Sequence, residues 1–413
     1  MSRKTSEGLG WKRLDNHLIQ RRNHMIQSTS LFAQILGLVK RSEFSRIVEL
    51  HKAEYDSKGF SSWTQFSSML FGQFARCESL REICHGLHTL NGKLPHLGIS
   101  EAPKKSTLAY ANEHRPWAVY RDVFFHVRRQ CEEIATLQKR KFRFHNPVES
   151  MDATLIPVCL SVFDWAHYRR SKGAIKLHML LSHQGYLPKW AMVTTGKTHE
   201  VKVLKTLVFE PNTIVVIDRG YNDYQVFAEW TRQKVFFVTR MKDNATYRVV
   251  RRQSVPERGN IRRDEIIEFT GFYSQKKCSC PLRRIVLWDA EKERELVFLT
   301  NIFHLAASTV ARVYKDRWQI EVFFRAIKQL LPVQTFLGTS ENAVQTQIWI
   351  ALIAILLLKF LQMKSQFQWS LSNLLVMIRL NLMQYVNLWE WLSKPFGDPK
   401  VRLKDLYARP LFA

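Results

Sequence analysis

Residues 310–331, VARVYKDRWQIEVFFRAIKQLL, limit most strongly what this chain can fold into. The segment contains no glycine, and its first proline comes only afterwards, at Pro332. Its apolar residues recur at helical spacing, so the pattern predicts one continuous helix. On a wheel of about 100° per residue, one side of this helix carries Val313, Ile320, Phe323, Phe324, Ile327, Leu330 and Leu331. That side is expected to pack against a core.

Four polar residues lie beside the apolar side of this predicted helix. Tyr314, Arg317, Glu321 and Lys328, which we call the polar stripe, fall within an arc of about 60° on the same wheel. A face that only meets water lies opposite the core, whereas this stripe borders it, which indicates a half-buried working surface. The alternative is a row of i,i+4 and i,i+7 salt bridges, which are common on helices. The helix alone leaves both interpretations open.

The length and charge of the chain point to a large, strongly basic protein. Its 413 residues suit two or three domains. With 62 basic and 36 acidic residues the formal charge is +26, which indicates a polyanionic partner, most often nucleic acid. An anionic membrane surface is the alternative partner. The longest apolar run, residues 348–358, is shorter than the roughly 20 residues that span a bilayer, so we expect a buried core helix and no membrane.

The N-terminus and the cysteines favour a cytoplasmic location. Met1 is followed by polar and charged residues, not by the apolar segment of a secretory signal. Only Cys278 and Cys280 are close together, and C-x-C is not a usual zinc spacing. We therefore expect reduced thiols at the six cysteines, Cys77, Cys84, Cys131, Cys159, Cys278 and Cys280.

The first part of the chain, residues 1–145, reads as all-helical. Ser62 with Gln65, and Ser79 with Glu82, are predicted capping boxes that open two short helices. Two short helices with a tight joint resemble a helix-turn-helix pair, which binds DNA. The alternative is a plain helical hairpin.

The order of predicted elements then changes to strands and helices. Residues 146–242 read as β-β-β-α-β-α-β, which matches an α/β, ribonuclease-H-like fold. Residues 243–300 carry many cations and strand-like stretches, and we interpret them as a β-rich insertion. Residues 301–345 contain the helix described above and return to the sheet, completing a catalytic core. Residues 346–413 are expected to form a helical C-terminal region.

Two carboxylates mark the predicted sheet. Asp152 lies inside the first strand, where a charge is unfavourable, and Asp218 ends the fourth strand. These strands are neighbours in a ribonuclease-H-like sheet, so both acids are expected to meet Glu321 from the helix. Three converging carboxylates repel one another unless cations lie between them. Mg²⁺ prefers oxygen ligands, and two such ions about 3.5–4 Å apart support in-line attack on phosphorus.

Each acid also has an ordinary interpretation. Asp152 fits a strand edge, and Asp218 fits a cap of the following helix. Among lesser candidates, Asp223 is best explained as a helix cap, and His199 as a surface residue beside the capping Glu200.

The spacing Y-x2-R-x3-E-x6-K of the polar stripe resembles the YREK signature of the insertion-sequence-four family, a branch of the DDE transposases of bacterial insertion sequences. The predicted acids Asp152, Asp218 and Glu321 match the three DDE positions. The run DRGY, residues 218–221, resembles the second-acid motif of that family. Residues 32–106 are similar to the helical domain of one of its subgroups.

The resemblance implies a DNA-cleaving and strand-transferring enzyme. The DDE acids would bind two Mg²⁺ ions, for which Mn²⁺ can substitute. Tyr314, Arg317, Lys328 and Arg219 would contact DNA. The partners implied are double-stranded DNA, as terminal inverted repeats and as target, and a second copy of the chain on paired ends, in a nucleoid-associated cytoplasmic protein. A structure-selective nuclease, or a retired transposase that only binds DNA, stays open as an alternative.

The same resemblance raises one question about the insertion. Related enzymes that cut through a DNA hairpin stack a flipped base on an aromatic residue there. Trp288 lies in this region, but we favour a core-strand residue.

Overall fold

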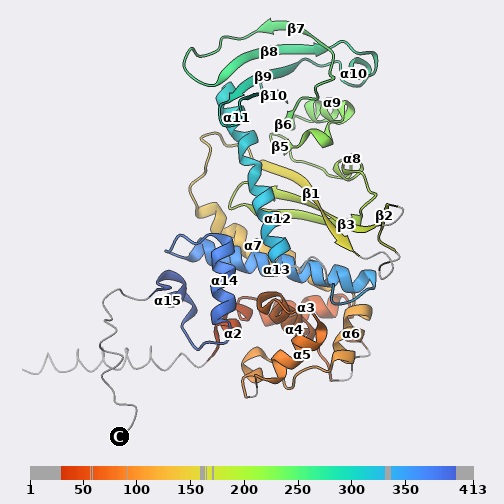
Figure 1. Ribbon diagram of the computed structural model, residues 1–413, viewed down its shortest axis with the longest axis vertical. Coiled ribbons are helices and arrows are strands. Elements are labelled where there is room, and N and C mark those ends of the chain that lie inside the picture. The colour runs from red at the N-terminus through yellow and green to blue at the C-terminus, as the bar shows by residue number, and fades with distance from the viewer. Residues whose placement is uncertain are drawn as a thin grey trace, which may run out of the picture. The chain divides into compact units, whose positions relative to one another are not determined.

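The computed structural model describes residues 29–396 except for 56, 58, 91, 159–162, 164, 170–171 and 331–335. The chain forms two compact units, Met1–Ala111 with Phe360–Ala413, and Asn112–Lys359 (Figure 1). Residues 1–28 of the predicted helical segment 1–145, and residues 397–413 of the segment 346–413, lie outside the described residues. Cys159 lies outside them too. The five described cysteines are free thiols, as predicted.

The first unit is helical and joins distant parts of the chain. Its helices are α2 (Leu31–Leu36), α3 (Arg41–Leu50), α4 (Ser62–Ala75), α5 (Leu80–His88), the 3₁₀ helix η1 (Leu94–Leu97), most of α6 (Lys105–His114), α14 (Leu371–Asn381) and α15 (Leu388–Ser393). The amide of Leu31 donates to the carbonyl of Gln384 at 2.8 Å, and that of Phe32 to Leu382 at 2.9 Å. The C-terminal helices therefore complete the core that the N-terminal helices begin.

Helices α4 and α5 form a tight pair. The Ser79 hydroxyl accepts from the amide of Glu82 at 3.2 Å, so the predicted cap of α5 is confirmed. The predicted Ser62 cap was wrong by one residue, because Ser61 accepts from the amide of Thr64 and caps α4. At Gly72 an added Cβ would lie 2.4 Å from the Ile83 side chain, so the two helices touch closely.

The second unit is built on one mixed sheet. It begins with α7 (Ala118–Leu137). The described residues then contribute ten strands: β1 (Val148–Val158), β2 (His167–Arg169), β3 (Lys172–Ser182), β4 (Leu187–Thr195), β5 (Ile214–Ile217), β6 (Phe236–Arg240), β7 (Tyr247–Arg252), β8 (Ile261–Phe269), β9 (Leu282–Asp289) and β10 (Arg294–Thr300). Their order is β2-β3-β1-β5-β6-β10-β9-β8-β7, with β4 also paired to β3.

The middle of this sheet agrees with the predicted strand order. Strand β1 pairs in parallel with β5, in the register Met151 to Ile217, so the first and fourth predicted strands are neighbours. Strand β10 pairs antiparallel with β6, so the strands of the predicted insertion extend the same sheet (Figure 1). A short helix, α10 (Phe272–Lys277), lies between β8 and β9.

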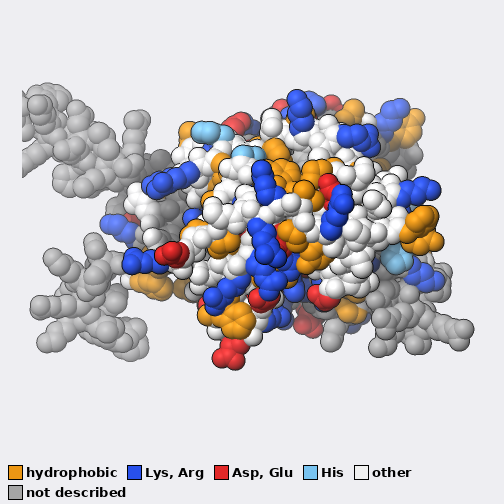
Figure 2. All heavy atoms as spheres, turned by 90° about the horizontal axis from the view of Figure 1, so that it is seen from above, with side chains coloured by type: hydrophobic (Ala, Val, Ile, Leu, Met, Phe, Trp, Pro, Cys, Tyr) orange, Lys and Arg blue, Asp and Glu red, His pale blue; other side chains and the backbone are white. Residues whose placement is uncertain are grey.

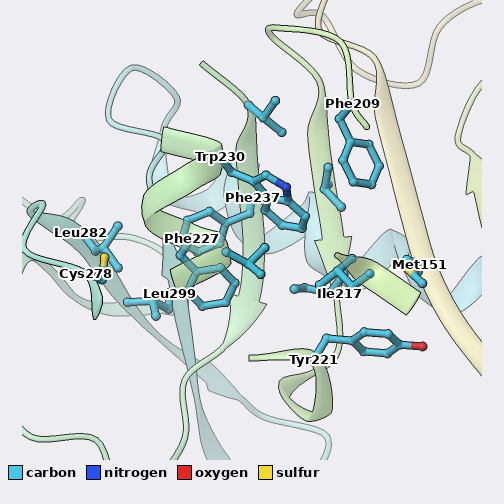
Figure 3. Close-up of a cluster of buried hydrophobic side chains, with 14 of the residues drawn as sticks. Met151, Phe209, Ile217, Tyr221, Phe227, Trp230, Phe237, Cys278, Leu282 and Leu299 are labelled. Atoms are coloured by element: carbon cyan, nitrogen blue, oxygen red, sulfur yellow. The ribbon is translucent and has the colours of Figure 1, made fainter. Parts of the chain in front are cut away.

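Alternating side chains bury both faces of the sheet. On one face, Met151 and Ile217 belong to a core cluster with Phe227 and Trp230 of α9 (Tyr224–Arg232), and α8 (Glu200–Leu204) contributes to it (Figure 3). On the other face, Val216 packs with residues of α11 (Ala307–Asp316).

Because Asp152 and Asp218 directly follow Met151 and Ile217, the alternation directs them toward the α11 face.

The prediction of one continuous helix over 310–331 was wrong at Arg317. Helix α11 ends at Asp316, and α12 (Trp318–Leu330) begins two residues later, after Arg317. The amide of Arg317 donates to Tyr314 at 3.1 Å and that of Ile320 to Arg317 at 3.0 Å, so these bonds span three residues instead of four. Local tightening of this kind turns the side chains on either side of the joint. Arg317 has a partner on β1, and Asp316 has partners in the turn between β3 and β4.

Helix α13 (Glu341–Lys364) contains the apolar run, which is buried as predicted. By length and composition it is the one helix of the described chain that could cross a membrane, but 89% of its apolar window is buried inside the protein. The core helix of a protein outside the membrane passes the same test.

A buried ion pair fastens the outer strands to the rest of the sheet. Arg283 on β9 donates to both carboxylate oxygens of Asp264 on β8, at 2.8 and 2.6 Å. Its Nη1 also donates to the carbonyls of Ile302 and Leu305, beyond β10, at 3.0 and 2.6 Å.

We expect Arg283→Ala to lower the free energy of unfolding by about 3–5 kcal/mol, because it leaves the Asp264 charge buried and unpaired. The control is Arg263→Ala, whose exposed pair with Glu295 spans 3.9 Å and should cost less than about 1 kcal/mol. Urea unfolding of both variants measures the difference. Equal losses would mean that the buried pair does not hold the outer strands.

Candidate active site

One guanidinium joins two of the predicted acids. Arg317 Nη1 lies 3.0 Å from Asp152 Oδ2 on β1, and its Nη2 lies 2.8 Å from Glu321 Oε1 on α12. The pair with Glu321 is the i,i+4 salt bridge that the alternative interpretation expected. The pair with Asp152 goes further, because it ties the helix joint to the sheet.

The third acid is held by the first residue of the polar stripe. Asp218 directly follows β5, and its Oδ1 accepts a hydrogen bond from the Tyr314 hydroxyl at 3.3 Å. Asp218 stands at the N-cap of the 3₁₀ helix η2 (Arg219–Tyr221), yet its side chain makes no capping hydrogen bond. Helix capping therefore does not explain Asp218, whose carboxylate instead faces α11.

Burial and repulsion shift the pKa of one of these acids, Asp152. Burial, with added repulsion from Asp218 and Glu321, raises the pKa of Asp152 from 3.8 to about 6, although Arg317 and the Ala153 amide oppose the shift. Burial likewise raises the pKa of Tyr314 to about 12, so its hydroxyl stays protonated and donates. The site therefore holds more negative charge than one arginine neutralises.

Two predicted residues take no part in these contacts. Lys328 is exposed on α12 and forms no ion pair with any residue that the structure describes. Arg219 is half exposed and pairs with Asp243 at 3.2 Å.

The lesser candidates have plain structural roles. Asp223 Oδ1 accepts from the amides of Gln225 and Val226, so the predicted capping of α9 is confirmed. His199 precedes α8 without capping it, while Glu200 pairs with Lys176 at 2.8 Å. Trp288 is half-buried on β9, with the Arg262 guanidinium 6.0 Å from its ring centre.

Sequence reasoning missed a buried polar cluster beside the site. Asp316, which directly precedes Arg317, is in contact with Lys141, His183 and Tyr186. A signal was present, since Asp316 lies three residues after Val313 and four before Ile320, on the apolar side of the predicted helix. A charge at a core position needs partners.

The donor set suits a hard cation. The three acids offer carboxylate oxygens, which Mg²⁺ prefers as ligands. Their mutual repulsion also favours a bound cation. Within the described ranges, no group of three or more His, Cys, Asp or Glu side chains is arranged to hold a metal ion. Arg317 itself lies between Asp152 and Glu321, so a metal would have to displace its guanidinium.

Comparison with known families covers the part of the chain that carries these acids. Residues 145–357 match the family described as the transposase DDE domain, which covers the sheet and helices α11 and α12. Residues 27–100 match a separate domain family of unknown function. The chain therefore belongs to the DDE transposases.

Curated relatives place the chain among transposases of bacterial insertion sequences. It is 35% identical over 237 residues to a probable transposase for insertion sequence element IS5377 of Geobacillus stearothermophilus, spanning 57% of this chain and 62% of that protein. It is 30% identical over 270 residues to the putative transposase y4zB of Sinorhizobium fredii, spanning 62% and 71%. A putative transposase for element IS4SA of Synechocystis is 22% identical over 300 residues, spanning 70% and 81%.

Among solved structures, a piggyBac transposase synaptic complex with hairpin DNA aligns with 92% of this chain and 85% of that one. Its TM-score is 0.46 at 11% identity, which is too low to support any argument about this chain.

The raised pKa of Asp152 predicts a stability that falls with rising pH. A carboxyl whose pKa is higher in the folded state than in the unfolded state stabilises the fold less as it ionises, here between pH 4 and 6. In metal-free protein, Asp152→Asn should therefore raise the free energy of unfolding at pH 8, by up to about 3 kcal/mol, and change little near pH 3.5.

Asp223→Asn is the control with the opposite sign. The pKa of Asp223 is lowered, since hydrogen bonds from Lys205 and the α9 amides outweigh its burial, so its stabilising effect is present above pH 4. Urea unfolding with EDTA at both pH values measures the two variants. A loss of stability for Asp152→Asn at pH 8 would contradict the pKa assignment.

Proposed function

We propose that this protein is the transposase of an insertion sequence, which binds the terminal inverted repeats of the element, cleaves the DNA and joins the ends to a target. The observation that carries the proposal is the convergence of three acids from separate elements. Asp152 on β1 and Glu321 on α12 share Arg317, and Asp218 after β5 is bonded to Tyr314 of α11.

We assign the core, residues 146–242 with 301–345, to the ribonuclease-H-like fold. Three observations support this assignment. Strands β1, β5 and β6 are parallel neighbours, β3 is antiparallel to β1 and pairs antiparallel with β4, and helices pack on both faces. In this assignment residues 243–300 are an insertion whose strands extend the core sheet.

Asp152, Asp218 and Glu321 would hold two Mg²⁺ ions, for which Mn²⁺ can substitute. When bound, the ions lower the pKa of an attacking water or 3′-hydroxyl and stabilise the leaving oxygen. The protein supplies the ligands from β1, the end of β5 and α12, and the buried core on the opposite face of the sheet fixes the two strands. Rigid placement matters because small errors in geometry cost much rate.

The polar stripe would act on the DNA backbone. Arg317 pairs with both Asp152 and Glu321, and if a cation took its place there, its guanidinium would be free to contact phosphate. Lys328 is exposed two turns beyond Glu321, where it would meet the same strand. Tyr314 would orient Asp218 and offer its hydroxyl to the backbone. Arg219, exposed beside Asp218, would add a further phosphate contact.

Other basic surfaces would extend the DNA contact. Figure 2 shows Lys and Arg side chains gathered on the face above β7, which carries the exposed Arg248, Arg251 and Arg252. In the helical part, α4 is buried while Arg81, His85 and His88 of α5 are exposed, as expected for a recognition helix. We assign end recognition to residues 1–145, and we propose a homodimer on paired ends in the cytoplasm, at the nucleoid.

Replacing any of the three acids with alanine should abolish cleavage while leaving binding of the terminal repeats within about twofold, because these residues hold metal and do not anchor DNA. The measurements are cleavage of a repeat-bearing DNA in Mg²⁺ and a gel-shift assay on the same preparations. Near-normal cleavage by one variant would remove that residue from the site. Joining of cut ends to a plasmid separates a transposase from a nuclease that only hydrolyses.

Lys328→Ala should keep the melting temperature and reduce strand transfer by about tenfold, the loss expected when a phosphate contact of about 1.4 kcal/mol disappears from the transition state. Lys315→Ala, which removes an exposed lysine of α11, is the matched control and should transfer normally. If Lys328→Ala transfers strands as well as the control does, Lys328 makes no contact that strand transfer needs, and its place in the polar stripe is structural.

A further inference from the structure

A buried network surrounds the carboxylate of Asp316. Its Oδ2 lies 2.7 Å from His183 Nδ1, and the Tyr186 hydroxyl donates to it, 3.1 Å from either oxygen. Lys141 pairs with the same carboxylate. On the other side of the imidazole, His183 Nε2 lies 2.6 Å from the Ser150 hydroxyl. We call Ser150, His183, Asp316, Tyr186 and Lys141 the Asp316 network.

The Asp316 network connects four separate parts of the second unit. Ser150 lies on β1, two residues before Asp152, while His183 and Tyr186 belong to the turn between β3 and β4. Lys141 precedes β1, and Asp316 ends α11 directly before Arg317. The network therefore ties the strand that carries Asp152 to the helix joint that carries Arg317.

The chemistry of the network excludes a nucleophilic role. Ser150, His183 and Asp316 are spaced like a Ser-His-Asp triad, but the serine is 0% exposed and no substrate can reach it. A negative charge at the C-terminal end of a helix is unfavourable, and burial adds to its cost. Burial would raise the pKa of Asp316, but bonds from His183 and Lys141 outweigh it, so the pKa is lowered and the group stays charged.

We propose that Asp316 is a positioning residue for Arg317: the Asp316 network fixes the joint between α11 and α12 so that the guanidinium reaches both Asp152 and Glu321. The negative charge of Asp316 destabilises the fold at this place unless its partners surround the carboxylate. They surround it only when the joint between α11 and α12 has this geometry. The network thus sets how strongly Arg317 competes with a cation for the two acids. This inference rests on the proposed function of the site, and it concerns residues that neither the polar stripe nor the DDE acids include.

The test is a double-mutant cycle of Asp316→Asn and Arg317→Ala, read by Mn²⁺ binding in electron paramagnetic resonance. Asp316→Asn should loosen Arg317, so Mn²⁺ should bind more tightly, by about fivefold, while DNA cleavage slows by a similar factor. In the Arg317→Ala background the same substitution should change Mn²⁺ binding by less than about 1.5-fold, because coupled residues are not additive. General damage to the site would instead weaken Mn²⁺ binding.

Asp264→Asn is the matched control, since it also removes a buried carboxylate from an arginine pair in this unit. It should lower the melting temperature and leave Mn²⁺ binding unchanged in both backgrounds. If Asp316→Asn does not fold, Tyr186→Phe removes only the contacts of the hydroxyl with Asp316 and Lys141 and should shift Mn²⁺ binding in the same direction.

Weaker Mn²⁺ binding by Asp316→Asn, or an equal change with and without Arg317, would overturn the proposal. If wild-type protein binds no Mn²⁺, the proposed function fails. The same cycle measured by unfolding of metal-free protein then decides the positioning role: additive losses of stability refute it, and non-additive losses support it.

Discussion

The structure around the site depends on one arginine between two carboxylates. Three acids gathered at a half-buried place repel one another, and without compensation α12 would be pushed away from the sheet. Arg317 provides that compensation, since a guanidinium presents parallel donors to two partners at once. Burial, with the repulsion from Asp218 and Glu321 that remains, still raises the pKa of Asp152 to about 6. The site is thus assembled without a cation but is left short of positive charge.

The second constraint is the alternation of side chains along the strands. Met151 and Ile217 are fully buried between the sheet and helices α8 and α9 (Figure 3), which leaves the residue after each of them facing the opposite side. A shift of one residue in β1 or in β5 would turn the acid of that strand into an apolar core. The hydrophobic packing on one face therefore fixes the acidic site on the other.

Local signals in the sequence pointed to residues that the structure brings together. An acid ending a buried strand marked Asp218, a charge inside a strand marked Asp152, and helical spacing grouped Tyr314, Arg317 and Glu321. Sequence reasoning failed where partners are distant in the chain. The joint at Arg317 and the place of Asp316 depend on His183 and Lys141, more than 100 residues earlier, and no periodicity within the helix encodes them. The pairing of β10 with β6 is likewise a property of the assembled sheet.

That pairing also sets the order in which the protein can be completed. Strand β10 pairs directly with β6 although β7, β8 and β9 lie between the two in the chain, and α11 and α12 follow β10 directly. Glu321 and Arg317 can therefore dock late, after contacts of high sequence separation have closed, and such closures are slow. A partly folded chain would carry Asp152 and Asp218 without their third acid, so under the proposed function it would cut DNA only when its folding is nearly finished.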